Sequence, residues 1–217
     1  MIFIDFDDVI FNTGEFKRDF KNMFIENGIS AEIFDKYYND PNDNRAIKTF
    51  DPWKQIERMH RDLDIDTKHI TSLVNVYISD ISSYVFDDVE NFVNKFKQEK
   101  ICIVSFGEKE FQTKKIENSQ ISKIIKNVAI TENSKSETIA QILKLKSNLN
   151  NEKNFFIDDR VEQIGDVKSR FPDMITIFMK RPEGRYQEMQ KENCCNYQVC
   201  NLTEAAEIIE KYEEQQN

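Results

Sequence analysis

Six short apolar segments recur along the chain, with helix-like stretches between most of them. The segments are rich in β-branched and aromatic residues, which is typical of buried parallel strands. They lie at residues 1–4, 101–104, 127–130, 155–157, 174–179 and 197–199. The stretches 87–100, 134–149 and 202–215 place apolar residues at helical spacing. This alternation predicts an α/β fold with a doubly wound, Rossmann-like parallel sheet.

Residues 12–85 break the alternation, because they contain no convincing pair of strands. Phenylalanines spaced four residues apart and two N-cap signals predict helices instead. These signals are Phe16, Phe20, Phe24, Ser30 and the pair Asp51-Pro52, and residues 69–81 form a further amphipathic stretch. The segment is too long for a connecting loop. We therefore expect a core of residues 1–11 plus 86–217 and an inserted all-helical cap of residues 12–85.

Charge and composition narrow the possible partners. The formal net charge of −9 argues against a general nucleic-acid-binding protein, since phosphate backbones need a basic face. No apolar run approaches the roughly 18 residues of a membrane span, and three of the first eight residues are acidic, unlike a secretory signal. The four cysteines lack the ligand spacing of a zinc site. We expect reduced thiols in a cytoplasmic protein without a membrane partner.

Polar residues that could take part in catalysis or ligand binding follow the predicted strands. In open α/β sheets, ligands bind beyond the carboxyl ends of the strands. The residues at these positions are Asp5 and Asp7 after the first strand, Ser105 after the second, Lys135 at the helix after the third, and Asp158 and Asp159 after the fourth. We expect them to converge at one edge of the sheet, where a cation would compensate the carboxylates.

Each of these groups suits a step of phosphoryl transfer. Mg²⁺ prefers hard oxygen ligands, and the candidate ligands are Asp5, Asp7, Asp158 and Asp159. A carboxylate beside the cation can attack phosphorus, which fits Asp5. Asp7 can protonate the leaving alcohol, while Ser105 and Lys135 can hold the phosphoryl oxygens.

The same segments resemble the motifs of the haloacid dehalogenase-like hydrolase superfamily, in its phosphatase branch. The resemblance lies in "IFIDFDDVIF" (2–11), "ICIVSFG" (101–107), "NFFIDDR" (154–160) and the position of Lys135. The predicted helical insertion stands where this family places its first type of cap. The resemblance implies that a small phosphorylated metabolite, a phosphomonoester, is hydrolysed with Mg²⁺ through a phospho-Asp5 intermediate.

Several alternatives stay open. Lys135 lacks the proline that often follows it in this family, so Lys123, Lys126 or Lys144 could take its place. A phosphotransferase or mutase would use a sugar hydroxyl in place of water. A carbon–halogen hydrolase is disfavoured because Asp7 is present, and a catalytically silent binding or regulatory module on the same fold is the alternative from another class.

Three further assignments are structural or concern the cap. Asp8 is expected to be structural. Residues 181–185 ("RPEGR") could contact a substrate, but they are expected first to form a turn. Cap residues that could contact a substrate are Arg45, Lys48, Trp53, Arg58 and His60.

Overall fold

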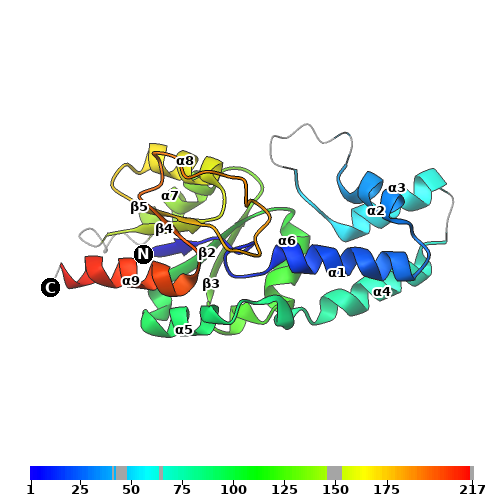
Figure 1. Cartoon of the computed structure of the whole chain (residues 1–217), viewed down its shortest axis with the longest axis horizontal. Helices are drawn as coiled ribbons and strands as arrows, with labels where there is room; N and C mark the ends of the chain where they lie inside the picture. The colour runs from blue at the N-terminus through cyan, green and yellow to red at the C-terminus, as the bar shows by residue number, and fades with distance from the viewer. Residues whose placement is uncertain (41, 43–47, 64–65, 146–152, 216–217) are drawn as a thin grey trace.

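The structure is a computed structural model that describes residues 1–40, 42, 48–63, 66–145 and 153–215 (Figure 1). All six predicted strands form, and they join one parallel sheet in the order β3-β2-β1-β4-β5-β6. The strands are β1 (Ile2–Ile4), β2 (Ile101–Phe106), β3 (Asn127–Thr131), β4 (Phe155–Asp158), β5 (Ile175–Met179) and β6 (Tyr197–Val199). The expected doubly wound parallel sheet is therefore confirmed.

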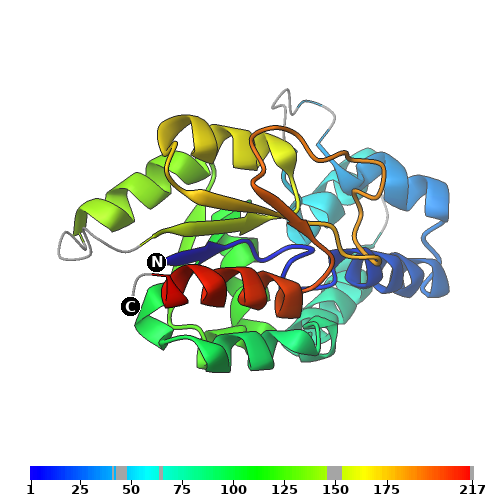
Figure 2. The ribbon, with the colours of Figure 1, turned by 60° about the vertical axis from the view of Figure 1, so that its left-hand side comes forward.

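Helices cover both faces of this sheet (Figures 1 and 2). Side chains of a strand alternate between the faces, so Phe3 and Phe156 belong to one apolar cluster, while Ile4 and Ile157 belong to the other. The cluster of Phe3 contains residues of α7 and α8, and the cluster of Ile4 contains residues of α5 and α9. The helices are α5 (Asp88–Lys95), α6 (Lys109–Asn118), α7 (Lys135–Leu145), α8 (Val161–Arg170) and α9 (Leu202–Glu214).

Between β1 and α5, the described elements are helices joined by loops, with isolated bridges at the two ends of this region. The helices are α1 (Thr13–Glu26), α2 (Ala31–Tyr38), α3 (Pro52–Leu63), α4 (Lys68–Ser79) and the 3-10 turn η1 (Ser82–Tyr84). The two N-cap signals are confirmed: Ser30 Oγ accepts from Ile33 N at 3.3 Å, and Asp51 Oδ1 accepts from Lys54 N at 2.9 Å. The phenylalanine stripe of α1 is buried.

The two ends of this helical region lie side by side. Asn12 N donates to Tyr84 O at 2.7 Å, and Phe86 N donates to Ile10 O at 3.0 Å. A single antiparallel bridge joins Phe11 to Val85 between them. The helical region thus leaves and re-enters the rest of the chain at one place, and its function as a separate cap domain of residues 12–85 stays a prediction.

One helix ends earlier than its pattern predicts. The helix expected over 87–100 ends at Lys95, because Phe96 adopts extended backbone (φ −120°, ψ 156°) and packs its ring 5.2 Å from that of Phe92. A short 3-10 turn, η2 (Gln98–Lys100), follows. The last residues of the helix expected over 134–149 lie outside the described residues.

Within the described residues, no helix combines the length and apolar character needed to cross a membrane. The four cysteines are all free thiols.

Candidate active site

Three carboxylates meet at the carboxyl ends of β1 and β4. Ile4 of β1 pairs with Ile157 of β4, so the residues that follow, Asp5 and Asp158, reach the same edge of the sheet. One ligand oxygen from each of Asp5, Asp158 and Asp159 lies within 4.8 Å of the others, and all three residues are buried. This edge is where the strand order reverses, which is the usual ligand site of such sheets.

Lys135 completes this cluster as predicted from its place at the start of α7. Its Nζ lies 2.7 Å from Asp5 Oδ1 and 2.7 Å from Asp158 Oδ2, and the side chain is buried. Burial alone would lower the pKa of this ammonium, but the two carboxylates outweigh it and raise the pKa above the ordinary value. Lys135 is therefore a fixed positive charge between two carboxylates.

A single ammonium leaves the cluster short of positive charge. Burial raises the pKa of Asp5 to about 7, an effect that Lys135 opposes and Asp158 adds to. Burial and the charges of Asp158 and Asp5 also raise the pKa of Asp159 well above its ordinary value. Asp159 Oδ2 is buried and has no hydrogen-bond partner among the described residues. Hard oxygen donors, excess negative charge and an unpartnered buried oxygen fit a divalent cation such as Mg²⁺.

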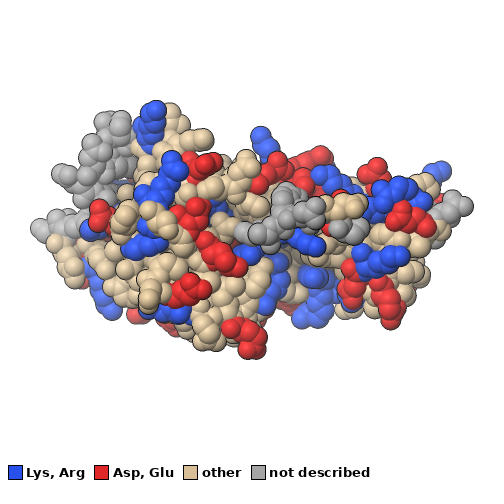
Figure 3. All heavy atoms as spheres, turned by 90° about the horizontal axis from the view of Figure 1, so that it is seen from above, with Lys and Arg blue, Asp and Glu red and all other residues tan. Residues whose placement is uncertain are grey.

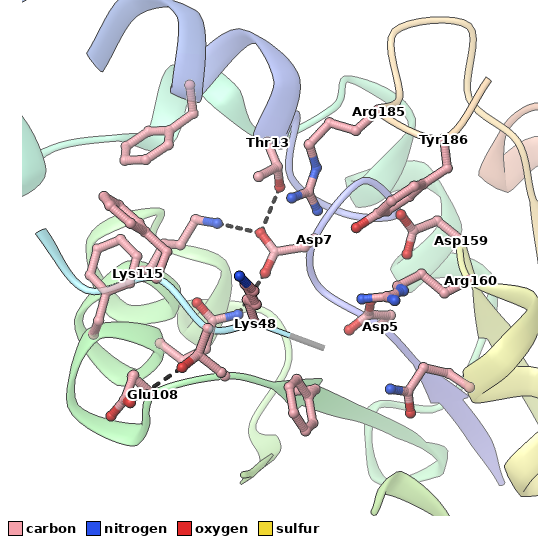
Figure 4. Close-up of a pocket in the computed structure, with 18 of the residues that line it drawn as sticks. Asp5, Asp7, Thr13, Lys48, Glu108, Lys115, Asp159, Arg160, Arg185 and Tyr186 are labelled. Carbon is pink, nitrogen blue, oxygen red and sulfur yellow. Dashed lines mark hydrogen bonds and ion pairs between the residues drawn. The ribbon is translucent and has the colours of Figure 1, made fainter. Parts of the chain in front are cut away.

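Asp7 lies in a second group of residues, apart from that cluster (Figure 4). Thr13 Oγ1 donates to Asp7 Oδ1 at 2.6 Å, Lys115 Nζ contacts the same oxygen, and Gln112 Nε2 donates to Asp7 Oδ2 at 2.7 Å. Burial opposes ionisation of Asp7, but Lys115 and Arg185 outweigh it and hold its pKa well below the ordinary value. Asp7 is thus an ionised carboxylate here, and its carboxylate is absent from the acidic cluster formed by the described residues.

Ser105 is fully buried at the end of β2, and its Oγ accepts a hydrogen bond of 2.7 Å from Gln112 Nε2. Its neighbours Phe106 and Gly107 line the pocket beside Asp5, but Ser105 itself does not. A Cβ on Gly107 would lie only 3.0 Å from Gln112 Cγ. Ser105 therefore lies behind the pocket wall, and its predicted contact with a phosphoryl group stays a prediction.

The pocket around Asp5 is closed from two sides. The helical region contributes Tyr38, Lys48 and Phe50, and the Tyr38 and Phe50 rings stack at 4.2 Å. The core contributes Glu108 and Phe111 of the region around α6. Residues of the helical region and of the core thus both line the pocket beside Asp5, the nucleophile candidate.

Only one of the described cap candidates lines this pocket, namely Lys48. Trp53 lies instead against Phe111, with ring centres 6.0 Å apart, and donates to Asn75 Oδ1 at 3.0 Å. Arg58 is buried and donates to backbone carbonyls of α2, and His60 is exposed. Arg45 lies outside the described residues.

Residues 181–185 form the expected turn, closed by a bond from Gly184 N to Arg181 O at 3.0 Å. Asp8 is buried, adopts a left-handed backbone (φ 53°) and pairs with Arg185, and its expected structural role stays a prediction. The structure also places Arg185 and Tyr186 in the pocket wall.

Four residues of the site went unrecognised in the sequence: Thr13, Gln112, Lys115 and Tyr186. Arg185 was considered only as part of the segment 181–185. A signal existed for Lys115, because it follows Phe111 by four residues on the buried face of α6. A lysine on an apolar stripe is rarely buried without a partner. No comparable local signal marks Arg185, whose partner Asp8 is 177 residues away.

The fold and the site together define a class of protein: a doubly wound α/β protein with an acidic cluster and a buried lysine at its switch point. The strand order is that of Rossmann-like sheets. Helices inserted after the first strand cover the pocket.

Several solved structures of haloacid dehalogenase-like proteins share this architecture. A protein of Burkholderia xenovorans LB400 described as a haloacid dehalogenase-like hydrolase aligns with a TM-score of 0.77 and 16% identity, over 98% of this chain and 97% of its own. The hydrolase YfnB of Bacillus subtilis, bound to magnesium, aligns with a TM-score of 0.59 and 13% identity. The alignment covers 96% of this chain and 97% of YfnB. L-2-haloacid dehalogenase of Xanthobacter autotrophicus aligns with a TM-score of 0.62 and 12% identity. The alignment covers 97% of this chain and 98% of the dehalogenase.

No family model and no curated protein matches the sequence. The structural likeness extends over nearly the whole chain, and the chain has the haloacid dehalogenase-like fold.

Proposed function

We propose that the protein is a Mg²⁺-dependent phosphatase that hydrolyses a small phosphomonoester through a phospho-Asp5 intermediate. The observation that carries this proposal is the meeting of Asp5, Asp158 and Asp159, with Lys135 paired to Asp5 and Asp158. Asp5, Asp158 and Asp159 would hold the cation. When bound, Mg²⁺ would neutralise the carboxylates and polarise the phosphoryl oxygens.

Asp5 is the nucleophile in this proposal. One carboxylate oxygen forms a bond to phosphorus while the bond from phosphorus to the alcohol oxygen breaks. Water then attacks the phosphorus of phospho-Asp5, which releases inorganic phosphate and restores the carboxylate. Lys135 holds Asp5 in place and offers a positive charge for the transferred oxygens.

Asp7 donates the proton that the leaving alcohol requires. Because Lys115 and Arg185 favour its ionised form, Asp7 must gain a proton and loosen its contact with Lys115 when substrate is bound. The proposal therefore includes a rearrangement of this ion pair during turnover.

The state of Asp7 also favours one second candidate, hydrolysis of a carbon–halogen bond. A halide leaves without being protonated, so an ionised Asp7 would be no obstacle, and L-2-haloacid dehalogenase shares the fold. A phosphotransferase would share the phospho-Asp5 step and differ only in the acceptor. The expected partner of the phosphatase is a small phosphorylated metabolite in the cytoplasm, with neither nucleic acid nor membrane involved.

A substrate panel tests the proposal. Purified protein is assayed with p-nitrophenyl phosphate and a set of phosphomonoesters, with Mg²⁺ and with EDTA, and chloride release is measured from a 2-chlorocarboxylic acid. Phosphate release that needs Mg²⁺ supports the phosphatase. Chloride release unaffected by EDTA, with no phosphate release, supports the dehalogenase instead, and transfer to added sugars without free phosphate supports the phosphotransferase.

A further inference from the structure

Two arginines from separate segments lie beside Tyr186 in the pocket wall (Figure 4). Arg160 precedes α8, and Arg185 lies in the turn after β5. The guanidinium carbon of each lies 5.2 Å from the centre of the Tyr186 ring. All three residues line the pocket that contains Asp5. Burial opposes the charge of Arg185, but the nearby carboxylates of Asp8, Asp7 and Asp159 outweigh it and raise its pKa.

Both arginines keep hydrogen-bond donors to spare. Arg185 donates through Nε to Asp8, and its two terminal nitrogens have no hydrogen-bond partner among the described residues. The Arg160 side chain makes a long contact of 3.4 Å from Nη2 to Glu162, and its buried Nε has no described partner. Their side chains are 32% and 20% exposed, so a ligand in the pocket can reach them.

The two buried lysines of the site are held by carboxylates of the protein. Lys135 is shared by Asp5 and Asp158, and Lys115 is paired with Asp7. On the face of the molecule shown in Figure 3, basic and acidic side chains are interspersed.

We infer that Arg160 and Arg185 bind a second anionic group of the substrate, a carboxylate or a second phosphate, in addition to the phosphoryl group at Asp5. This inference rests on the proposed phosphatase function. The planar guanidinium presents paired N–H groups that match the oxygens of a carboxylate or a phosphate. The preferred substrate is then a small phosphomonoester with an acidic group at its other end.

Three substrates of one chain length test the inference. Glycerol 3-phosphate, 3-phosphoglycerate and glycerol 1,3-bisphosphate end in a hydroxymethyl group, a carboxylate and a phosphate respectively. With Mg²⁺, we expect kcat/KM to be about 10-fold or more higher for at least one of the two acidic compounds, the scale of one hydrogen bond to a charged group. The favoured compound identifies the anion. Equal values for all three would overturn the inference.

Failure of the proposed function would look different, because none of the three compounds would then release phosphate. In that case calorimetry with the Asp5→Asn variant compares binding of 3-phosphoglycerate, the bisphosphate and glycerol 3-phosphate. Tighter binding of an acidic compound still supports the second anion site. Equal binding, or none, overturns it.

Variants separate a second anion from the transferred phosphoryl group. Arg185→Met would leave Asp8 buried without its partner, so the double variant Asp8→Asn/Arg185→Met is compared with Asp8→Asn alone, and Arg160→Met is made separately. We expect each arginine change to bring the ratio of kcat/KM values toward one. The control Arg170→Met, at the exposed end of α8, keeps the ratio. An equal loss of kcat/KM with all three substrates would show that the arginines contact the transferred phosphoryl group, and it would overturn the inference.

Discussion

Lys115 of α6 forms a buried ion pair with Asp7, across 108 residues of sequence. Its ammonium also lies 4.5 Å from the centre of the Phe11 ring. This pair ties α6 to the turn that carries the candidate acid, so its loss should affect both stability and the state of Asp7.

Lys115→Met should lower the free energy of unfolding by about 3 kcal/mol, because it leaves a largely buried carboxylate without its cation. Denaturant unfolding measures this. The double variant Lys115→Met/Asp7→Asn should recover much of the loss, since the amide carries no charge. Lys109→Met, at an exposed position of the same helix, is the matched control. A double variant no more stable than Lys115→Met alone would contradict the assignment of the loss to this ion pair.

Asp5→Asn should reduce turnover of p-nitrophenyl phosphate by about 10⁴-fold or more, the scale seen when a nucleophile is removed. Acid quenching during turnover of a radiolabelled substrate should trap labelled wild-type protein and leave the variant unlabelled. Asp173→Asn, in an exposed turn, is the control and should behave as wild type. Labelling of the Asp5→Asn variant would show that another residue is the nucleophile.

Asp7→Asn should slow hydrolysis of an alkyl phosphate by roughly 10²-fold or more, the usual contribution of general acid catalysis. p-Nitrophenolate is a good leaving group and needs little protonation, so its release should slow much less. The ratio of the two rates is the measurement. An equal loss with both substrates would assign Asp7 a role in positioning instead of proton donation.

The raised pKa of Asp5 predicts how pH and Mg²⁺ act together on stability. The folded protein holds this proton up to about pH 7, whereas the unfolded chain releases it near its ordinary pKa of 3.8. The contribution of Asp5 to stability is therefore full at acid pH and is lost as pH rises through about 7. In EDTA, the free energy of unfolding should be lower at pH 8 than at pH 5.5. This difference should be smaller in the Asp5→Asn variant than in the wild type.

Mg²⁺ should raise the melting temperature more at pH 8 than at pH 5.5, since protons compete with the cation for the same carboxylates. Equal shifts at the two pH values, or none at either, would contradict cation binding at Asp5, Asp158 and Asp159.

Lys48 is the described cap cation that lines the pocket, so Lys48→Met should change which phosphomonoesters are preferred. Lys68→Met, at the exposed start of α4, should leave the order unchanged. Relative kcat/KM values over the substrate panel provide the readout. The same order in the wild type and both variants would argue against substrate selection by Lys48.

Local sequence patterns determined most of the fold. The six strands could be predicted because each is a short run of β-branched and aromatic residues, and Ser30 and Asp51 marked helix starts because side-chain capping is a local interaction. The positions of Asp5 and Asp158 could be predicted from the rule that parallel strands share one carboxyl edge. Lys135 was found for the same reason, since it begins the helix after β3.

Contacts between distant segments were decided only by the tertiary structure. Asp7 was expected beside the metal ligands, but the left-handed turn at Asp8 and the donors Thr13 and Lys115 place it in a separate group. The approach of Arg160 and Arg185 to the Tyr186 ring depends on how α8 and the turn after β5 pack together. Spacing along the chain reports which residues share a helix face or a strand end. It does not report which charged side chains meet across the fold, because that depends on the packing of whole elements against one another.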